Sequence, residues 1–158
     1  MSRDQAFLEI AQRLGYLLES ELKTGGHYVP VLREGAYAYV SGQTPRIAHE
    51  MVVQGQVGRD VSLNEACFAA QICILRALDF MQKELGSLDA VARFLKLTVY
   101  VQSASDFLQQ SVVADAASQL LTDIFADQGQ HTRSAIGVIQ LPANATVEID
   151  LIAKMIEE

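Results

Sequence analysis

Two charged residues near the end of the chain have side chains suited to binding and hydrolysing a small anionic molecule. Arg133 begins an expected strand, and a guanidinium stays charged and presents a planar pair of donors to two carboxylate oxygens. Glu148 lies in the last expected strand, where a carboxylate can orient a water molecule and carry a proton. Taken alone, an arginine at a strand start is most often a surface ion pair, and a strand glutamate is most often solvated. The pattern by itself therefore leaves both roles open.

The spacing of the two strands restricts how Arg133 and Glu148 can act together. If residues 133–141 and 146–154 formed a tight hairpin, Glu148 would lie opposite Ile139. Arg133 is six residues from Ile139, which is about 20 Å in an extended strand. The two side chains could not then hold one ligand. Either the strands are not direct neighbours, or the site takes Arg133 from one chain and Glu148 from another.

The other residues with reactive side chains do not form a recognisable site. His27, His49 and His131 have no metal-spaced partner, so we expect structural or surface roles for all three. Cys67 and Cys73 are six residues apart in one expected helix, which points them to different sides. We expect both cysteines to be reduced and buried. We also expect no metal site and no cofactor.

The elements that must position these residues follow from hydrophobic periodicity and from capping signals. Ser62 and Glu65 form a capping-box pattern at the start of a long helix, and Gly86 is expected to end it. The order predicts an α+β domain of 158 residues, with a mixed sheet, two helices on one face and an extra N-terminal helical extension over residues 1–24. The expected helices are 3–22, 63–85 and 112–125, and the expected strands are 28–32, 36–40, 91–103, 133–141 and 146–154.

Composition excludes several classes of protein. Half of the residues are hydrophobic and 20% are charged, which argues for a packed core rather than disorder. The net charge is −7, which disfavours nucleic acid as a partner. No apolar run is long enough to span a membrane, and the first residues are amphipathic rather than a secretory signal. We therefore expect a cytoplasmic protein with no nucleic-acid or membrane partner.

Three segments of the chain combine into a recognisable pattern. They are Gly26-His27-Tyr28-Val29-Pro30 with Tyr39-Val40-Ser41-Gly42-Gln43-Thr44-Pro45; Val99-Tyr100-Val101 leading to Asp106-Phe107; and Thr132-Arg133-Ser134-Ala135 through Leu141-Pro142 to Val147-Glu148-Ile149. Together these segments resemble the reactive-intermediate deaminase (RidA/YjgF, L-PSP-like) family. The resemblance covers roughly residues 26–155, so the N-terminal helix lies outside it and the chain looks like a longer, divergent branch. The third segment is the most specific, because it combines an arginine, an apolar strand, Leu-Pro and a strand with glutamate.

The resemblance implies a chorismate-mutase-like domain that assembles as a homotrimer with ligand clefts between subunits. It implies an enamine/imine deaminase, which hydrolyses small reactive 2-imino acids to 2-keto acids and ammonia. The alternative is a non-catalytic trimer of the same family that binds a small carboxylate as a sensor or scavenger. Ribonuclease activity or inhibition of translation, also described in the family, is disfavoured by the acidic charge.

The resemblance also implies roles for single residues. Arg133 matches the arginine that grips the substrate carboxylate, and Glu148 matches the glutamate that positions water. Two departures bear on the activity: Ala135 stands where many members have cysteine, and Asp115 sits near an asparagine of the pattern, which would change what the pocket accepts. The remaining pocket residues that it implies are Tyr28, Ser41 and Gly42.

Overall fold

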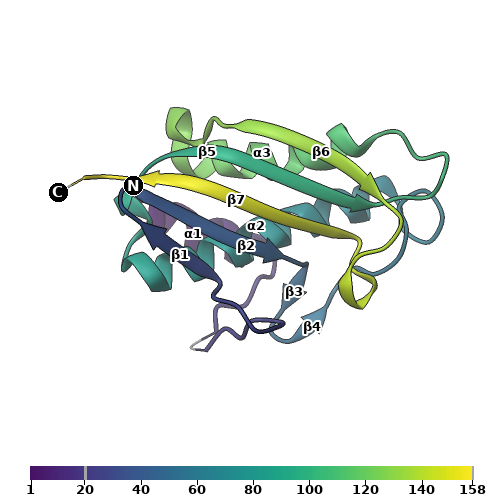
Figure 1. Ribbon diagram of the computed structural model, residues 1–158, viewed down its shortest axis with the longest axis horizontal. Coiled ribbons are helices and arrows are strands. Elements are labelled where there is room, and N and C mark those ends of the chain that lie inside the picture. The colour runs from purple at the N-terminus through teal and green to yellow at the C-terminus, as the bar shows by residue number, and fades with distance from the viewer. Residues whose placement is uncertain (20, 158) are drawn as a thin grey trace.

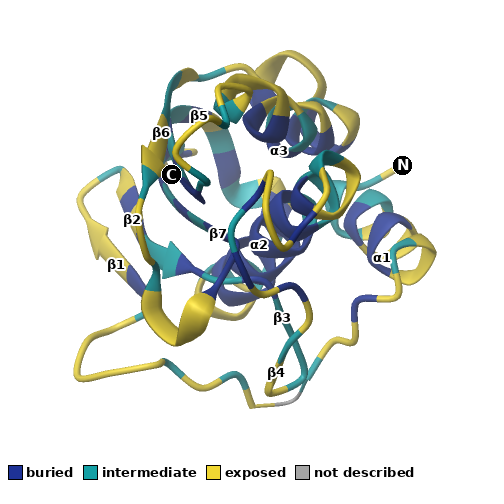
Figure 2. Cartoon of the chain, turned by 90° about the vertical axis from the view of Figure 1, so that its right-hand side faces the viewer, coloured by how far each residue is buried: buried dark blue, intermediate teal, exposed yellow. Residues whose placement is uncertain are grey.

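The computed structural model describes residues 1–19 and 21–157. It has one five-stranded sheet with helices packed on one face, as the views from two directions show (Figures 1 and 2). This confirms the expected α+β class. The helices are α1 (Arg3–Arg13), α2 (Leu63–Leu85) and α3 (Gln110–Phe125), and the strands are β1 (Val31–Glu34), β2 (Tyr37–Gln43), β3 (Arg46–Ile47), β4 (Glu50–Met51), β5 (Val91–Gln102), β6 (Thr132–Val138) and β7 (Val147–Met155).

The strand order is β1-β2-β7-β5-β6, so β5 separates the two strands that carry Arg133 and Glu148. β6 runs parallel to β5 at the sheet edge, whereas β7 is antiparallel to both β5 and β2. Arg133 pairs with Leu97 and Glu148 pairs with Tyr100. The tight hairpin considered from the sequence does not form.

The buried core lies between the sheet and α2 and α3. Along β7 every second residue is buried against the helices, and the residues between them face the open side. α2 packs against β7 and β2 through a strip of small side chains that allows close approach, and α3 packs against β5 and β6. Phe125 of α3 meets Phe94 of β5 edge-on, with ring centroids 4.8 Å apart. The strip on α2 consists of Ala66, Ala70, Cys73 and Ala77, all fully buried.

The N-terminal helix is shorter than predicted. The helix was expected to continue to residue 22, but α1 ends at Arg13. Gly15 has a φ of 71°, a left-handed conformation that ends a helix. Leu17 and Leu18 consequently lie in the following loop and are 60% and 43% exposed. The prediction also covered residue 20, which lies outside the described residues.

Two further predictions need correction. The strand expected over residues 36–40 is longer, because β2 continues through a bulge to Gln43 with a register shift against β7. Cys67 is only partly buried, whereas Cys73 is buried as expected, and both are free thiols. Among the described helices, none has the length and apolar character that a membrane span requires.

Candidate functional site

A cavity of about 900 Å³ opens where the end of β2 and the start of β7 meet the loop before β1. Four residues that the resemblance implied come together here, from three separate parts of the chain. They are Tyr28, Ser41, Gly42 and Glu148. Such a concave site with a few polar groups is where a small ligand usually binds.

The β2 bulge places Gly42 directly against the Glu148 carboxylate. A Cβ at position 42 would lie 2.9 Å from Cδ of Glu148 and closer still to its Oε1, so only glycine fits beside this carboxylate in its present position. The hydroxyl of Ser41 donates to the Val29 carbonyl at 2.8 Å. Ser41 thereby fixes the loop that carries Tyr28 to the end of β2.

The carboxyl group of Glu148 has a perturbed acidity. Burial, and next the nearby charge of Asp150, raise the pKa of Glu148 above its usual range. Burial also raises the pKa of Asp150 itself. A carboxyl group with a raised pKa is better matched to accepting and returning a proton near neutral pH than an ordinary glutamate.

Arg76 of α2 also reaches this cavity, and sequence analysis missed it. The residue is 5% exposed, its Nη2 donates to the Lys23 carbonyl at 3.1 Å, and its guanidinium lies over the Phe80 ring. Its Nη1 has no hydrogen-bond partner among the described residues. The available signal was an arginine within an otherwise apolar stretch of a buried helix.

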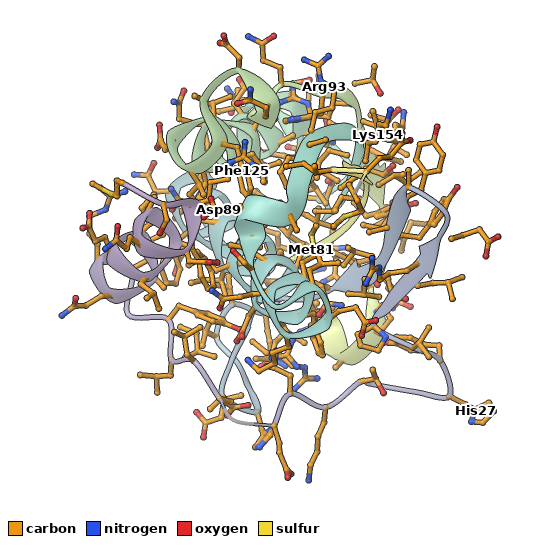
Figure 3. The ribbon with its side chains drawn as sticks, turned by 90° about the vertical axis from the view of Figure 1, so that its left-hand side faces the viewer. His27, Met81, Asp89, Arg93, Phe125 and Lys154 are labelled. Carbon is orange, nitrogen blue, oxygen red and sulfur yellow. The ribbon has the colours of Figure 1, made fainter. Side chains whose placement is uncertain are left out.

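The three histidines lie in different surroundings. His27 is exposed and extends from the outer part of the loop before β1 (Figure 3). His49 is at the cavity, with Nε2 3.9 Å from a carboxylate oxygen of Glu19. His131 is half-buried and hydrogen-bonded on both ring nitrogens. Within the part of the chain that the structure describes, no three metal-ligating side chains cluster.

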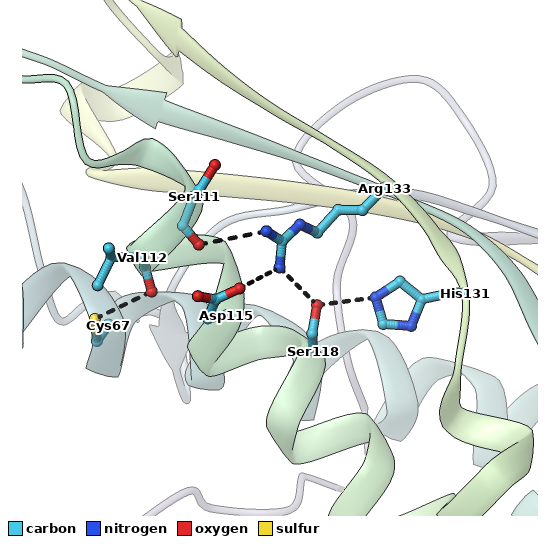
Figure 4. A network of polar contacts seen from close by, with 7 residues as sticks. All are labelled: Cys67, Ser111, Val112, Asp115, Ser118, His131 and Arg133. Carbon is cyan, nitrogen blue, oxygen red and sulfur yellow. Dashed lines mark hydrogen bonds and ion pairs between the residues drawn. The ribbon is translucent and has the colours of Figure 1, made fainter.

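Arg133 does not line the cavity. Its Nη1 donates to Asp115 at 2.8 Å and to the Ser118 hydroxyl at 3.1 Å, and its Nη2 donates to the Ser111 carbonyl at 3.4 Å (Figure 4). Arg133 and Asp115 are therefore together, at the edge of the sheet and on the helix side.

A single chain cannot bring Arg133 and Glu148 to one ligand, because they project from opposite faces of the sheet. Arg133 neighbours Leu97, which is buried under the helices, whereas Glu148 neighbours Tyr100 on the open side. The one strand between them, β5, adds a lateral separation of about 10 Å. Of the two arrangements that the sequence left open, non-adjacent strands are observed, but this alone does not unite the two residues.

Known proteins resemble this chain in sequence and in fold. The model of the family Endoribonuclease L-PSP matches residues 18–155. Protein TCP17 of Trypanosoma cruzi is 39% identical over 145 residues, which is 91% of each chain. A protein of unknown function from Agrobacterium tumefaciens is 34% identical with a TM-score of 0.88, over 98% of this chain and 95% of that one.

A putative endoribonuclease from Shewanella oneidensis has the same fold, with a TM-score of 0.89 at 23% identity, over 98% of this chain and 100% of that one. Because these two structures cover nearly the whole chain, their folds include a counterpart of α1, although the family match begins after it. The match over residues 18–155 and the TCP17 relationship together place this chain in the Endoribonuclease L-PSP family, the RidA/YjgF family.

Proposed function

We propose that the protein is an enamine/imine deaminase, which hydrolyses small 2-imino acids to 2-keto acids and ammonia at sites between the protomers of a homotrimer. One observation supports the proposal: within one chain, Arg133 and the cavity with Glu148 lie on opposite faces of the sheet. A cavity with Glu148 and Tyr28 lies on one side of the sheet, and Arg133 lies at the β6 edge. A neighbouring copy supplies the missing half to each.

Arg133 is suited to the ligand carboxylate because part of its guanidinium remains available. Nη1 is bonded to Asp115 and Ser118, and Nη2 makes one long bond. Within the described residues the Nε–H has no such bond, so the Nε side can donate to a carboxylate oxygen. The arginine side chain is 23% exposed, which leaves it reachable from solvent.

Glu148 supplies the second requirement, a group that orients water. An imine carbon is already electrophilic, so hydrolysis needs a positioned water and a group that exchanges protons with the departing ammonia. The half-buried carboxyl with its raised pKa fits that task. General acid–base assistance of this kind accelerates a reaction by roughly 10²–10⁴-fold.

The uncovered sheet face supports association of copies. The helices lie on one face only (Figure 2), and large apolar side chains are exposed on the other. Leu32, Tyr39 and Ile136 are 55%, 43% and 41% exposed. Exposed apolar residues that share one face mark an interaction surface, and identical chains usually associate into closed symmetric assemblies, of which a trimer is one.

A non-catalytic carboxylate-binding trimer is the alternative, and one assay separates the two. 2-Iminopropanoate is generated in situ, and its decay is followed with the wild type, with Arg133→Ala and with the exposed control Arg59→Ala. We expect acceleration by wild type and control, and a loss of about 10²-fold in kcat/KM for Arg133→Ala, from the roughly 3 kcal/mol of a buried charged contact.

If the wild type accelerates the decay of none of a range of imino acids, the deaminase proposal is refuted. Binding of pyruvate, lost in Arg133→Ala, would then establish the sensor or scavenger. The family name and the Shewanella oneidensis structure suggest RNA as a substrate, but the net charge of −7 opposes it. Salt-dependent RNA cleavage that is lost in the Arg133 variant would instead support a ribonuclease activity.

A further inference from the structure

A serine and a histidine lie beside Arg133 in an arrangement that the proposed function has not used. We propose that Ser118 and His131 form an acid–base pair that exchanges protons with a ligand held by Arg133. The inference rests on the proposed deaminase reaction and adds two catalytic residues to it. Figure 4 shows the pair, with Ser118 on α3 between the guanidinium and the imidazole ring.

The hydrogen bonds give the pair a definite polarity. Nδ1 of His131 is 2.6 Å from the Gly129 carbonyl oxygen, which only accepts, so Nδ1 carries the proton. Nε2 of the neutral ring is then an acceptor, and the Ser118 hydroxyl at 2.9 Å donates to it. The same hydroxyl oxygen accepts from Nη1 of Arg133 at 3.1 Å. Proton donation therefore runs from the arginine through the serine to the histidine.

The backbone that orients the imidazole is held rigidly. Gly129 packs so closely on α3 that a Cβ there would lie 2.9 Å from Cα of Thr122 and closer to the Leu121 carbonyl. Because these are backbone atoms, they cannot move aside. The Gly129 carbonyl is thus fixed as the acceptor for Nδ1, in the role of the group that sets the tautomer of a catalytic histidine.

The surroundings keep the ring in its basic form. Burial, and also the backbone bond and the positive charge of Arg133, act on His131, and the net effect lowers its pKa. The charged groups that face it are Arg133 on β6 and, across the guanidinium, Asp115 on α3. A neutral imidazole near pH 7 can accept a proton from the serine.

The contact between Ser118 and His131 is not needed to stabilise the fold. Ser118 and His131 are both only half-buried, so water could satisfy their polar atoms, and little stability depends on their contact. The serine also lies within hydrogen-bond distance of the guanidinium that would hold the ligand. The proposal places the imine carbon of a ligand held on the Nε side of Arg133 next to the Ser118 hydroxyl.

With this pair, every proton that moves during imine hydrolysis has a donor and an acceptor. The ligand is a protonated imine next to a carboxylate. A water oxygen, oriented by Glu148 of the neighbouring copy, forms a bond to the imine carbon and gives one proton to Ser118, which passes its own proton to Nε2 of His131. When the carbon–nitrogen bond breaks, the relay runs in reverse and returns its proton to the nitrogen, which leaves as ammonia. The hydroxyl left on the carbon gives its proton through the Glu148 carboxylate to this ammonia as the carbon–oxygen double bond forms. The products are the 2-keto acid and ammonium, and both residues are restored.

The test measures decay of 2-iminopropanoate from pH 5 to 9 for the wild type, Ser118→Ala, Ser118→Thr and His131→Gln. His27→Gln and Ser105→Ala are matched controls at exposed positions. We expect kcat to fall about 10²-fold in Ser118→Ala and His131→Gln, with KM changed less than threefold. Threonine keeps the hydroxyl and should retain most of the rate. The wild-type kcat should fall at a pH below the one at which an ordinary histidine gains a proton, because the pKa of His131 is lowered, and His131→Gln should lose this acidic limb.

The outcomes separate the two proposals. An active wild type with full kcat and an unchanged acidic limb in His131→Gln overturns the proton-transfer pair and leaves the deaminase intact. A wild type inactive on every imino acid overturns both. A thermal melt of each variant identifies misfolding, and an inactive but folded Ser118→Thr also counts against the pair, because its hydroxyl is present.

Discussion

Replacing Gly42 with alanine should move the Glu148 carboxylate without disturbing the fold. The added Cβ would lie 2.9 Å from Cδ and 3.2 Å from Cγ of Glu148, whereas carbon atoms in contact are normally about 3.5–4.0 Å apart. The carboxylate must therefore withdraw by roughly 1 Å, and a misplacement of that size costs about 10²-fold in rate.

Stability should change little in the same variant. Gly42 does not have a positive φ, so alanine can adopt its backbone conformation, and the side chain that it meets has a flexible end. The smaller entropy of the unfolded chain contributes about 0.4–1 kcal/mol in favour of alanine. We expect kcat/KM to drop about 10²-fold while Tm stays within a few degrees of the wild type.

Gly137→Ala is the matched control. Its Cβ would lie 2.8 Å from Nε2 of Gln110, a similar clash with a flexible side chain, but away from the cavity. We expect its kcat/KM to stay within about twofold of the wild type. Full activity in a folded Gly42→Ala protein would refute the idea that the position of the Glu148 carboxylate matters.

Two further changes test the electrostatics. Asp115 is 70% exposed in its ion pair with Arg133, and such pairs contribute about 1 kcal/mol or less. Asp115→Asn should therefore tighten pyruvate binding about two- to fivefold by calorimetry, and by less in 0.5 M salt. Weaker binding would contradict the idea that Asp115 competes with the ligand carboxylate for Arg133. Because burial raises the pKa of Glu148, its charged form destabilises the fold, and stability falls as pH rises through that pKa. Glu148→Gln should raise Tm at pH 8, with the gain vanishing near pH 4; a lower Tm at pH 8 would refute this.

Local signals predicted the long helix well. Ser62, Glu65 and Gly86 act on neighbouring backbone groups, and the observed helix starts and ends where they indicate. The end of α1 was wrong because apolar spacing continues to Leu18, whereas Gly15 bends the chain away before it. Hydrophobic periodicity indicates which residues are expected to be buried, but not where the backbone turns.

The arrangement of strands could not be read from local pattern. Nothing in residues 133–154 shows that β5 lies between the two last strands, because sheet neighbours are chosen by packing over the whole chain. The pairing register, which local pattern also does not show, places Arg133 and Glu148 on opposite faces. Family resemblance, rather than spacing, singled out Tyr28 and Gly42.

Ser118 and Arg76 were missed for a related reason. A serine on one face of a helix is indistinguishable in sequence from a solvated residue. Only the parallel pairing of β5 with β6 sets Arg133 and His131 above α3, where the serine meets both. Arg76 was missed because the residues around it in α2 predict a buried helix, and the sequence does not show that a cavity reaches this part of it.

Subunit complementation tests the shared site most directly. Arg133→Ala and Glu148→Gln chains are coexpressed in equal amounts, and the mixed oligomers are assayed for 2-iminopropanoate decay beside each variant alone. If every site takes Arg133 from one chain and Glu148 from its neighbour, about a quarter of the sites in a random closed ring keep both residues. We predict recovery of about a quarter of the wild-type rate. Mixed oligomers no more active than the separate variants would contradict a site shared between chains.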